Sequence, residues 1–325
     1  MNSSATTWAN TWAIVLAAGE GRRLQSLTTT EAGVAIPKQY CSLRGGPSLL
    51  REALQRAKTI ASPANICIVV ASHHKRWWDA ELAAEPKSNV IVQPGNRGTA
   101  NGILLPLLHI MARDPEARIV LLPSDHHLSD EHVLAGALRE AMRILEARRD
   151  HVLLLGMSPE EADPDLGYIV PGSADGRAVW TVSRFVEKPN APFAQVLIDA
   201  GALWNAFIVA AHAQALLELF ARRFPRIVAD MWSIIERNPC TGDAPDAVID
   251  LYRGLPEIDL SRQILQVTAS MLRVLRVQHC GWSDLGTPQR VAKVLRRLPR
   301  LEDVEDDGLH RRSGLLSLAT QHSRQ

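Results

Sequence analysis

The sequence predicts a doubly wound α/β fold whose sheet is mainly parallel. In its first half, short apolar segments alternate with segments in which apolar residues recur at helical spacing. This order is typical of parallel strands joined by helices. The short segments are uniformly apolar, as expected of strands that are covered on both faces. The expected strands of this half are Ala13–Ala18, Ile66–Ala71, Asn89–Gln93, Arg118–Leu122 and His151–Gly156.

The remaining elements follow from the same two periodicities. A helix is expected over Val133–Leu145, where Asp130 and Glu131 favour the helix start. Helical spacing is also expected to continue from Leu49. In the second half the expected strands are Val179–Pro189, Ala202–Ala211 and Met271–Gln278, and the expected helices are Ala191–Ala200, His212–Arg222, Pro225–Arg237 and Pro288–Leu298.

Composition bounds the class of protein. The chain has 325 residues, of which 46% are hydrophobic and 22% charged, and a net charge of +1, so no global field favours nucleic acid or an acidic membrane. Its 4 cysteines show no zinc spacing, and no run reaches the roughly 18 apolar residues that a membrane span needs. We expect a cytoplasmic protein with one domain over 13–301, a flexible N-terminus over 1–12 and a disordered tail over 302–325.

Polar segments follow the expected strands where a doubly wound sheet binds its ligands. They read AAGEGRR, QPGNRGTA and PSDHH. The first contains Gly19 and Gly21, but Leu24 replaces the third glycine of a dinucleotide loop, and no Lys-Ser/Thr pair completes a Walker loop. What remains is a glycine turn followed by arginines, which suits a phosphate because glycine lets backbone N–H groups approach an anion and arginine offers a forked donor. By itself this pattern is equally compatible with solvated arginines.

The motifs LAAGEGRRL…PKQY, QPGNRGTA, PSDHHL, FVEKPN, LWNAFIV and WSDLG occur in this order. Together they resemble the sugar-phosphate nucleotidyltransferases, and most of all the mannose-1-phosphate guanylyltransferases. The resemblance implies a Rossmann-like, GT-A-like fold of the nucleotide-diphospho-sugar transferases, with inserted sugar-binding strands. It also implies transfer of a nucleotidyl group from GTP to mannose 1-phosphate, with Mg²⁺ as the cofactor and pyrophosphate as the leaving group.

The resemblance assigns roles to individual residues. It implies Arg23, Lys38 and Asp125 as catalytic residues, with Asp125 and Asp284 as the magnesium ligands. The nucleotide-binding set that it implies is Leu16, Ala17, Gly19, Gly21, Gln93, Asn96, Arg97, Gly98 and Ser124, and the sugar-phosphate set is Gly167, Glu187, Lys188 and Asn205.

The chain departs from this pattern at one place in the sugar region. The family usually reads Trp-Asn-Ser-Gly where this chain has Trp204-Asn205-Ala206-Phe207. A hydroxyl is lost and a ring replaces the smallest residue, so the identity of the sugar stays open.

Other conspicuous residues have ordinary structural explanations. The pairs His73-His74 and His126-His127 are expected to point apart and not to chelate a metal. The Trp77-Trp78 pair is expected to pack in the core or an interface, and the arginines of 290–300 to form the solvated face of a helix.

Three alternatives remain open. The enzyme could use another base or sugar, as the glucose-1-phosphate thymidylyltransferases do. AAGEGRR…PKQY alone also resembles the cytidylyltransferases of isoprenoid synthesis, but VEKP and WSDLG favour a sugar phosphate instead. A non-catalytic nucleotide-sugar sensor is the third. The expected partners are a nucleoside triphosphate and a sugar 1-phosphate, with no nucleic acid and no membrane; a homodimer is one option for the oligomeric state.

Overall fold

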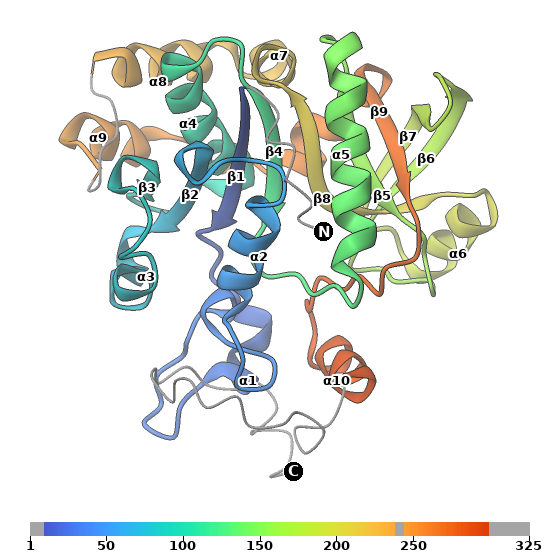
Figure 1. Cartoon of the computed structure of the whole chain (residues 1–325), viewed down its shortest axis with the longest axis horizontal. Helices are drawn as coiled ribbons and strands as arrows, with labels where there is room; N and C mark the ends of the chain where they lie inside the picture. The colour runs from blue at the N-terminus through green and yellow to red at the C-terminus, as the bar shows by residue number, and fades with distance from the viewer. Residues whose placement is uncertain (1–9, 238–243, 299–325) are drawn as a thin grey trace, which may run out of the picture.

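We describe residues 10–237 and 244–298 of a computed structural model of the chain. The tail expected at 302–325 and most of the N-terminus expected at 1–12 lie outside these residues. The central feature is a nine-stranded sheet with the strand order β3-β2-β1-β4-β8-β5-β9-β7-β6 (Figure 1). Its strands are β1 (Thr11–Ala17), β2 (Ile66–Ala71), β3 (Val90–Gln93), β4 (Arg118–Pro123), β5 (Val152–Met157), β6 (Gly167–Ala174), β7 (Val179–Glu187), β8 (Leu203–His212) and β9 (Leu272–Val277).

The first half of the sheet is parallel, as the sequence predicts. Strand β1 pairs in parallel with both β2 and β4, and β2 pairs in parallel with β3. All four strands therefore end at the same edge, and the loops that follow them lie together there. The strand β1 begins at Thr11, two residues before the expected start, and the buried Trp12 belongs to it.

The second half of the sheet is mixed. Strand β8 runs antiparallel to both β4 and β5, whereas β5 and β9 are parallel. Strands β6 and β7 form an antiparallel pair at the far edge. The sequence analysis did not identify β6, because Pro171 and Gly172 interrupt it and its outer half is exposed, so its apolar signal is short.

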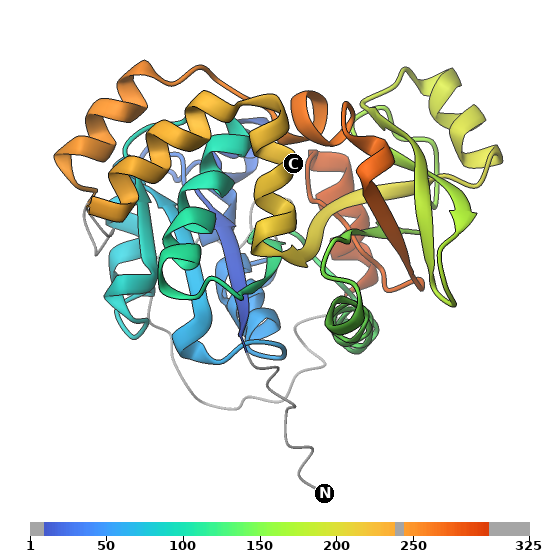
Figure 2. The ribbon, with the colours of Figure 1, turned by 90° about the horizontal axis from the view of Figure 1, so that it is seen from above.

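Helices cover both faces of the sheet (Figures 1 and 2). Residues of α2 and α5 pack in the core on one face, and residues of α4, α7 and α8 pack in the core on the other. The longer helices are α2 (Leu49–Ala57), α3 (Lys75–Glu81), α4 (Gly98–Arg113), α5 (Glu131–Ala147), α6 (Ala191–Asp199), α7 (Ala213–Arg223), α8 (Pro225–Arg237), α9 (Asp246–Gly254) and α10 (Pro288–Arg297). No helix within the described ranges has the length and apolarity that crossing a bilayer requires.

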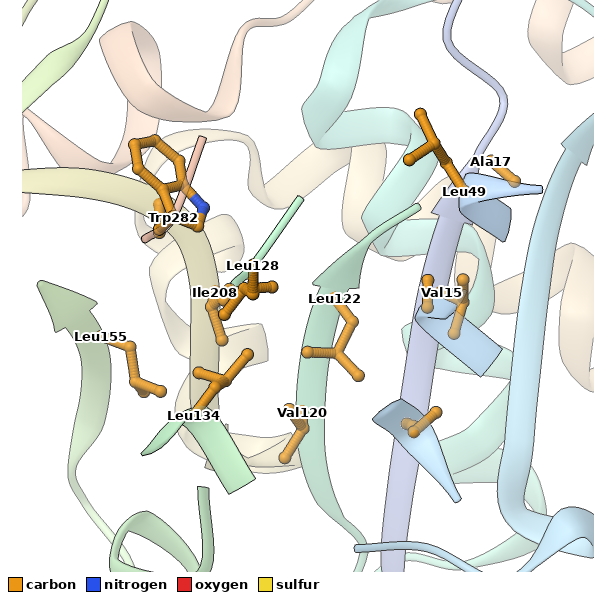
Figure 3. Packing of buried hydrophobic residues seen from close by; sticks show 14 of the residues in the cluster. Val15, Ala17, Leu49, Val120, Leu122, Leu128, Leu134, Leu155, Ile208 and Trp282 are labelled. Carbon is orange, nitrogen blue, oxygen red and sulfur yellow. The ribbon is translucent and has the colours of Figure 1, made fainter. Parts of the chain in front are cut away.

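Alternating residues of the strands pack in the two hydrophobic cores, one on each face of the sheet. In β1, Val15 points to the face covered by α2 and α5, and its neighbour Ile14 belongs to the opposite core. Leu49 of α2, Leu134 of α5 and Leu122 of β4 pack in the first core (Figure 3). Both faces are therefore covered, which explains why these strands are uniformly apolar.

Candidate active site

The loop after β1 is shaped by glycine and by a buried glutamine. Gly21 has φ of 63°, and a Cβ there would lie 3.1 Å from the backbone nitrogen of Lys38, so a side chain would be strained and crowded. The Gln39 Nε2 donates to the carbonyl oxygens of Ala17 at 2.9 Å and Gly19 at 3.0 Å. These bonds hold the carbonyls to one side and fix the course of the loop.

This loop borders a cavity of about 380 Å³ at the carboxyl edge of the parallel strands. A second hollow of about 520 Å³ adjoins it and contains Gly21, Arg22 and Lys38. Arg23, Asn96 and Asp125 line both hollows, so the two form one continuous site. The predicted residues that line the first cavity are Leu16, Gly19, Arg23, Gln93, Asn96, Gly98, Ser124, Asp125, Gly167, Glu187, Lys188, Asn205 and Asp284.

Lys38 joins the two predicted metal ligands. Its Nζ lies 2.9 Å from Asp125 Oδ2 and donates to the backbone carbonyls of Asp284 at 2.7 Å and Leu285 at 3.3 Å. These three acceptors use all three donors of the ammonium group. Lys38 is buried, so it positions Asp125 against the Asp284 segment and has no donor left for a phosphate.

Asp125 is held as a carboxylate. Desolvation in the cavity by itself raises the pKa of Asp125, but the Lys38 ammonium, His126 and hydrogen bonds together outweigh it and hold the pKa below its ordinary value. The side chain is 38% exposed to the cavity. An ionised oxygen is therefore accessible at neutral pH, as a metal ligand requires.

His126 is a cavity residue that the sequence analysis did not select. Burial lowers the pKa of His126 to about 4, so its ring is neutral at pH 7. Trp282 Nε1 donates to His126 Nδ1 at 3.2 Å, and a ring that accepts at Nδ1 carries its proton on Nε2. That nitrogen lies 3.8 Å from Asp125 Oδ1, on the opposite side of the carboxylate from Lys38.

Arg290 anchors α10 to the site, which corrects the prediction of a solvated arginine. Its guanidinium lies 2.9 Å from Asp163, 3.4 Å from Asp165 and 3.2 Å from Asp284, and only 12% of its side chain is exposed. The Asp284 Oδ1 also accepts from the backbone nitrogen of Gly286 at 3.0 Å. The carboxylate is thus oriented by fixed donors.

A hydrogen-bonded chain orients Gln93 at the other end of the cavity. Tyr252 donates its hydroxyl hydrogen to the carbonyl of Asn101 at 3.2 Å. The same hydroxyl lies 3.2 Å from the Gln93 amide and can only accept there, so the amide presents Nε2 to it. No described residue donates a hydrogen bond to Gln93 Oε1, which remains an acceptor for a ligand.

Two predicted nucleotide-binding residues lie apart from the cavity. Arg97 donates to the backbone carbonyls of Tyr252 at 2.7 Å and Arg253 at 3.1 Å, at the C-terminal end of α9. It does not line either hollow. The methyl group of Ala17 is buried in the core and only its backbone shapes the loop. The sequence could not show this, because α9 lies far from Arg97 along the chain.

The predicted sugar residues meet across strands β6, β7 and β8. A Cβ at Gly167 would lie 2.6 Å from Glu187 Oε2 and 3.3 Å from Asn205 Cβ, so glycine is required for these side chains to approach. Burial raises the pKa of Glu187, and the neighbouring Asp259 adds to this effect. Asp259 and Ser261 line the same cavity, but they lie just before and at the start of the short π-helical turn Ser261–Leu265 and carry no strand or glycine signal.

The backbone is unusual at this end. Lys188 has φ of 50° and Phe207 has φ of 57°, values that are uncommon for residues other than glycine. The pairing of β5 with β8 shifts register between Leu154 and Gly156, and such bulges re-aim side chains beside active sites. The bulge brings Phe207 to the cavity, at the position where the resemblance leads us to expect glycine.

The chain is similar to several proteins of known name. The chain is 27% identical over 282 residues to "Alginate biosynthesis protein AlgA" of Pseudomonas syringae pv. tomato, a match that covers 84% of this chain and 56% of the relative. It is also 27% identical over 299 residues to "Mannose-1-phosphate guanylyltransferase 2" of Escherichia coli O157:H7, with 85% of this chain and 58% of the relative covered. The chain thus spans little more than half the length of these relatives.

A similar solved structure is described as a "mannose-1-phosphate geranyltransferase" from Thermus thermophilus. It aligns with a TM-score of 0.70 and 26% identity over 85% of this chain and 76% of its own. The UDP-glucose pyrophosphorylase complexed with UDP-glucose, at 14% identity and a TM-score of 0.54, shares the fold. The family model described as "Nucleotidyl transferase" matches residues 12–299, and the chain therefore belongs to the nucleotidyl transferase family.

Proposed function

We propose that the chain transfers a nucleotidyl group from a nucleoside triphosphate to a sugar 1-phosphate, with GTP and mannose 1-phosphate as the substrates. The observation that carries this proposal is the continuity of the cavity. It runs from the glycine loop and Arg23, past Asp125 and Asp284, to Glu187 and Asn205. The names of the curated relatives add support for the guanylyl and mannosyl specificity.

The reaction needs no protein nucleophile. A sugar 1-phosphate oxygen, already anionic at pH 7, attacks the α-phosphorus of the triphosphate, and the bond to pyrophosphate breaks. The obstacles are repulsion between the two anions and charge growth on the leaving group, which cations and in-line positioning reduce. Among the cavity residues, Arg23 is suited to bind phosphate, because its side chain is 54% exposed and its nearest carboxylate is 4.0 Å away.

The residues fit a magnesium ion. Magnesium binds one or two carboxylates together with substrate phosphates and water, and Asp125 and Asp284 both line the cavity. When bound, the ion would neutralise phosphate charge. Lys38 and Arg290 would fix the positions of the two carboxylates, and Lys38 is therefore a positioning residue in this proposal.

Gln93 supports a guanine base. Its Nε2 is committed to Tyr252, so Oε1 is the atom that it offers to a ligand. A guanine edge carries N–H donors that this acceptor suits. At the other end, Glu187 and Asn205 would accept hydrogen bonds from sugar hydroxyls, and Lys188 would pair with the sugar phosphate.

The test is pyrophosphate release with Mg²⁺, measured for GTP, dTTP, UTP, CTP and ATP against mannose and glucose 1-phosphates. We expect selective turnover with GTP and mannose 1-phosphate, its loss in Asp125→Ala, and its retention in Asp230→Ala, which removes an exposed carboxylate of α8. Selective turnover with another pair would overturn the substrate assignment and keep the reaction. Nucleotide-sugar binding without turnover for any pair would overturn the enzyme proposal in favour of a sensor.

A further inference from the structure

Three side chains with metal-binding atoms converge beside the glycine loop. Sequence reasoning predicts that His73 and His74 point apart, and the structure shows that this is wrong. Residues Ser72–His74 form a short 3-10 turn after β2, and the two imidazole rings lie with their centroids 4.1 Å apart. The prediction covered a strand and a turn alike, and this turn places the two rings side by side instead.

Both histidines face Glu20, the residue between the two loop glycines. Glu20 Oε1 lies 3.0 Å from His73 Nε2, and Glu20 Oε2 lies 4.0 Å from His74 Nε2. One potential ligand atom from each of the three side chains lies within 4.8 Å of the other two. The cluster joins residues that are more than fifty positions apart in sequence, on the loops after β1 and β2.

The imidazole of His74 lacks hydrogen-bond partners among the described residues. Its side chain is buried, and its Nδ1 has no partner. Its Nε2 is 4.0 Å from Glu20, which is beyond hydrogen-bond distance. The ring nitrogen that faces Glu20, Nε2, is therefore not committed to another described residue and is available to a ligand.

We propose that Glu20, His73 and His74 form a three-ligand site for a divalent transition metal of the zinc type. Two imidazoles and one carboxylate are a donor set that Zn²⁺ accepts with a fourth position left for water or substrate. Magnesium prefers oxygen ligands, so this site differs in chemistry from the pair Asp125 and Asp284.

The three side chains can close around an ion with little rearrangement. Zinc ligands lie about 2.0–2.2 Å from the metal, which places tetrahedral ligand atoms roughly 3.3–3.6 Å apart. Glu20 Oε1 and His73 Nε2, now 3.0 Å apart, must separate slightly, and His74 Nε2, now 4.0 Å from Glu20 Oε2, must move closer. The His73 side chain is 49% exposed and that of Glu20 is 26% exposed, and both can rotate toward the buried His74. The exposed His73 also leaves a path by which the ion can enter.

A metal ion at this site would restrain the glycine loop after β1. Glu20 itself lines the adjoining hollow together with Gly21, and its other neighbour, Gly19, borders the main cavity. A bound ion would hold this loop against the turn after β2. The site does not depend on the proposed reaction, because its ligands are outside the residues assigned to that reaction.

The test is isothermal titration of the metal-stripped, tag-free full chain with Zn²⁺ in excess Mg²⁺, with Co²⁺ absorption as a second probe of imidazole coordination. We expect one Zn²⁺ per chain. His73→Ala and Glu20→Gln should each weaken binding more than roughly 100-fold, because a direct ligand should matter at least as much as the outer-shell partners that cost roughly 10–100-fold. His132→Ala, which removes an exposed histidine elsewhere, should leave the affinity unchanged.

Absence of saturable Zn²⁺ binding, or unchanged affinity in either His73→Ala or Glu20→Gln, would overturn the three-ligand assignment. Both substitutions are at accessible positions, and far-UV circular dichroism checks that the variants fold. Hydrogen exchange tests whether the ion restrains the glycine loop. Zn²⁺ should slow exchange of the amides of 18–22 in the wild type and not in His73→Ala. Equal exchange with and without Zn²⁺ in the wild type would contradict the proposed restraint of the loop.

Discussion

Lys38 shows how one buried side chain can connect two loops of a site. Its ammonium lies against Asp125 and two carbonyls of the Asp284–Leu285 segment, so it connects the loop after β4 to the loop after β9. Sequence reasoning identified this lysine through its resemblance to a phosphate-binding residue. Our proposal gives Lys38 a positioning role that one motif could not suggest, because its contacts join segments far apart in sequence.

Removing the Lys38 ammonium should affect both stability and turnover. In Lys38→Met, two buried carbonyls lose a donor and Asp125 loses its cation. We expect a loss of about 1–3 kcal/mol in the free energy of unfolding, below the roughly 3–5 kcal/mol of a fully buried pair, because Asp125 reaches solvent. Urea unfolding measures this loss.

In the same variant, kcat should fall roughly 100-fold, the scale of losing one electrostatic group in a site, with little change in the KM for the triphosphate. A large rise in that KM with unchanged kcat would show instead that Lys38 binds the nucleotide.

Phe207 should influence the choice of sugar. Its φ of 57° is strained for a side chain, and its ring borders the cavity beside Asn205. In Phe207→Gly we expect the ratio of kcat/KM between mannose and glucose 1-phosphates to change by roughly tenfold, because small changes of pocket shape are worth about 1–3 kcal/mol. Kinetics with both sugars measure this ratio. An unchanged ratio, with an unchanged KM for the triphosphate, would place Phe207 outside the sugar pocket.

Residues that follow strands could be predicted as cavity residues, and others could not. Gly19, Gln93 and Asp125 come directly after or at the end of parallel strands, and the edge of the sheet brings them together. Asp259 and Ser261 come from an irregular segment that reaches the cavity only by packing against Gly98 and its neighbours. Nothing in their local sequence indicates that contact.

At the scale of elements, the start of α4 depends on Gly98. Its φ is 81°, and a Cβ there would lie 2.3 Å from the carbonyl oxygen of Ile258. Gly98→Ala should therefore lower the free energy of unfolding by more than about 1 kcal/mol. Gly136→Ala is the matched control, because Gly136 lies inside α5 with no atom within 4 Å, and it should stabilise the chain by about 0.5–1 kcal/mol. Urea unfolding of both variants checks the contrast; a destabilised Gly136→Ala or a neutral Gly98→Ala would contradict it.

The contacts of α10 make its attachment sensitive to acid. Hydrogen bonds, chiefly from Arg297, lower the pKa of Glu160 to about 2. Burial opposes this shift, and hydrogen bonds from His279 and Lys293 add to it. A carboxyl with a depressed folded pKa contributes stability above its unfolded pKa of about 4.3, and this contribution is lost as pH falls toward the folded value. We expect Glu160→Gln to cost about 1 kcal/mol at pH 7.

That difference should shrink between about pH 4 and pH 2, as Glu160 becomes protonated in the wild type. Unfolding curves of both proteins across this range measure it. A difference that stays constant down to pH 2 would show that packing, and not the charge of Glu160, is responsible.

The elements themselves were predicted to different degrees. Strand β2 and helix α8 match the predicted ranges, because each is bounded by clear signals and covered as the pattern requires. Strand β6 was missed because Pro171 and Gly172 weaken its pattern, and α9 was missed because it is short and follows a segment rich in proline and aspartate. Both supply parts of the site, through Gly167 and through Tyr252.

At the scale of the whole molecule, one sheet carries both ends of the cavity. Its parallel half, β3-β2-β1-β4, presents the glycine loop and Asp125, and its mixed half presents Gly167, Glu187 and Asn205. The antiparallel strand β8 joins the halves by pairing with both β4 and β5. The doubly wound half was predictable from periodicity, whereas the reversed direction of β8 depends on long-range pairing that local patterns do not encode.

The central claim is that the two ends of the cavity hold the two substrates of one nucleotidyl transfer. The most direct measurement follows the α-phosphate: the chain is mixed with α-labelled GTP, mannose 1-phosphate and Mg²⁺, and the products are separated. The account predicts that the label appears in a nucleotide diphosphate sugar, with unlabelled pyrophosphate formed in equal amount. Label found only in free GMP, or only in unreacted GTP while the sugar phosphate is bound, would contradict it.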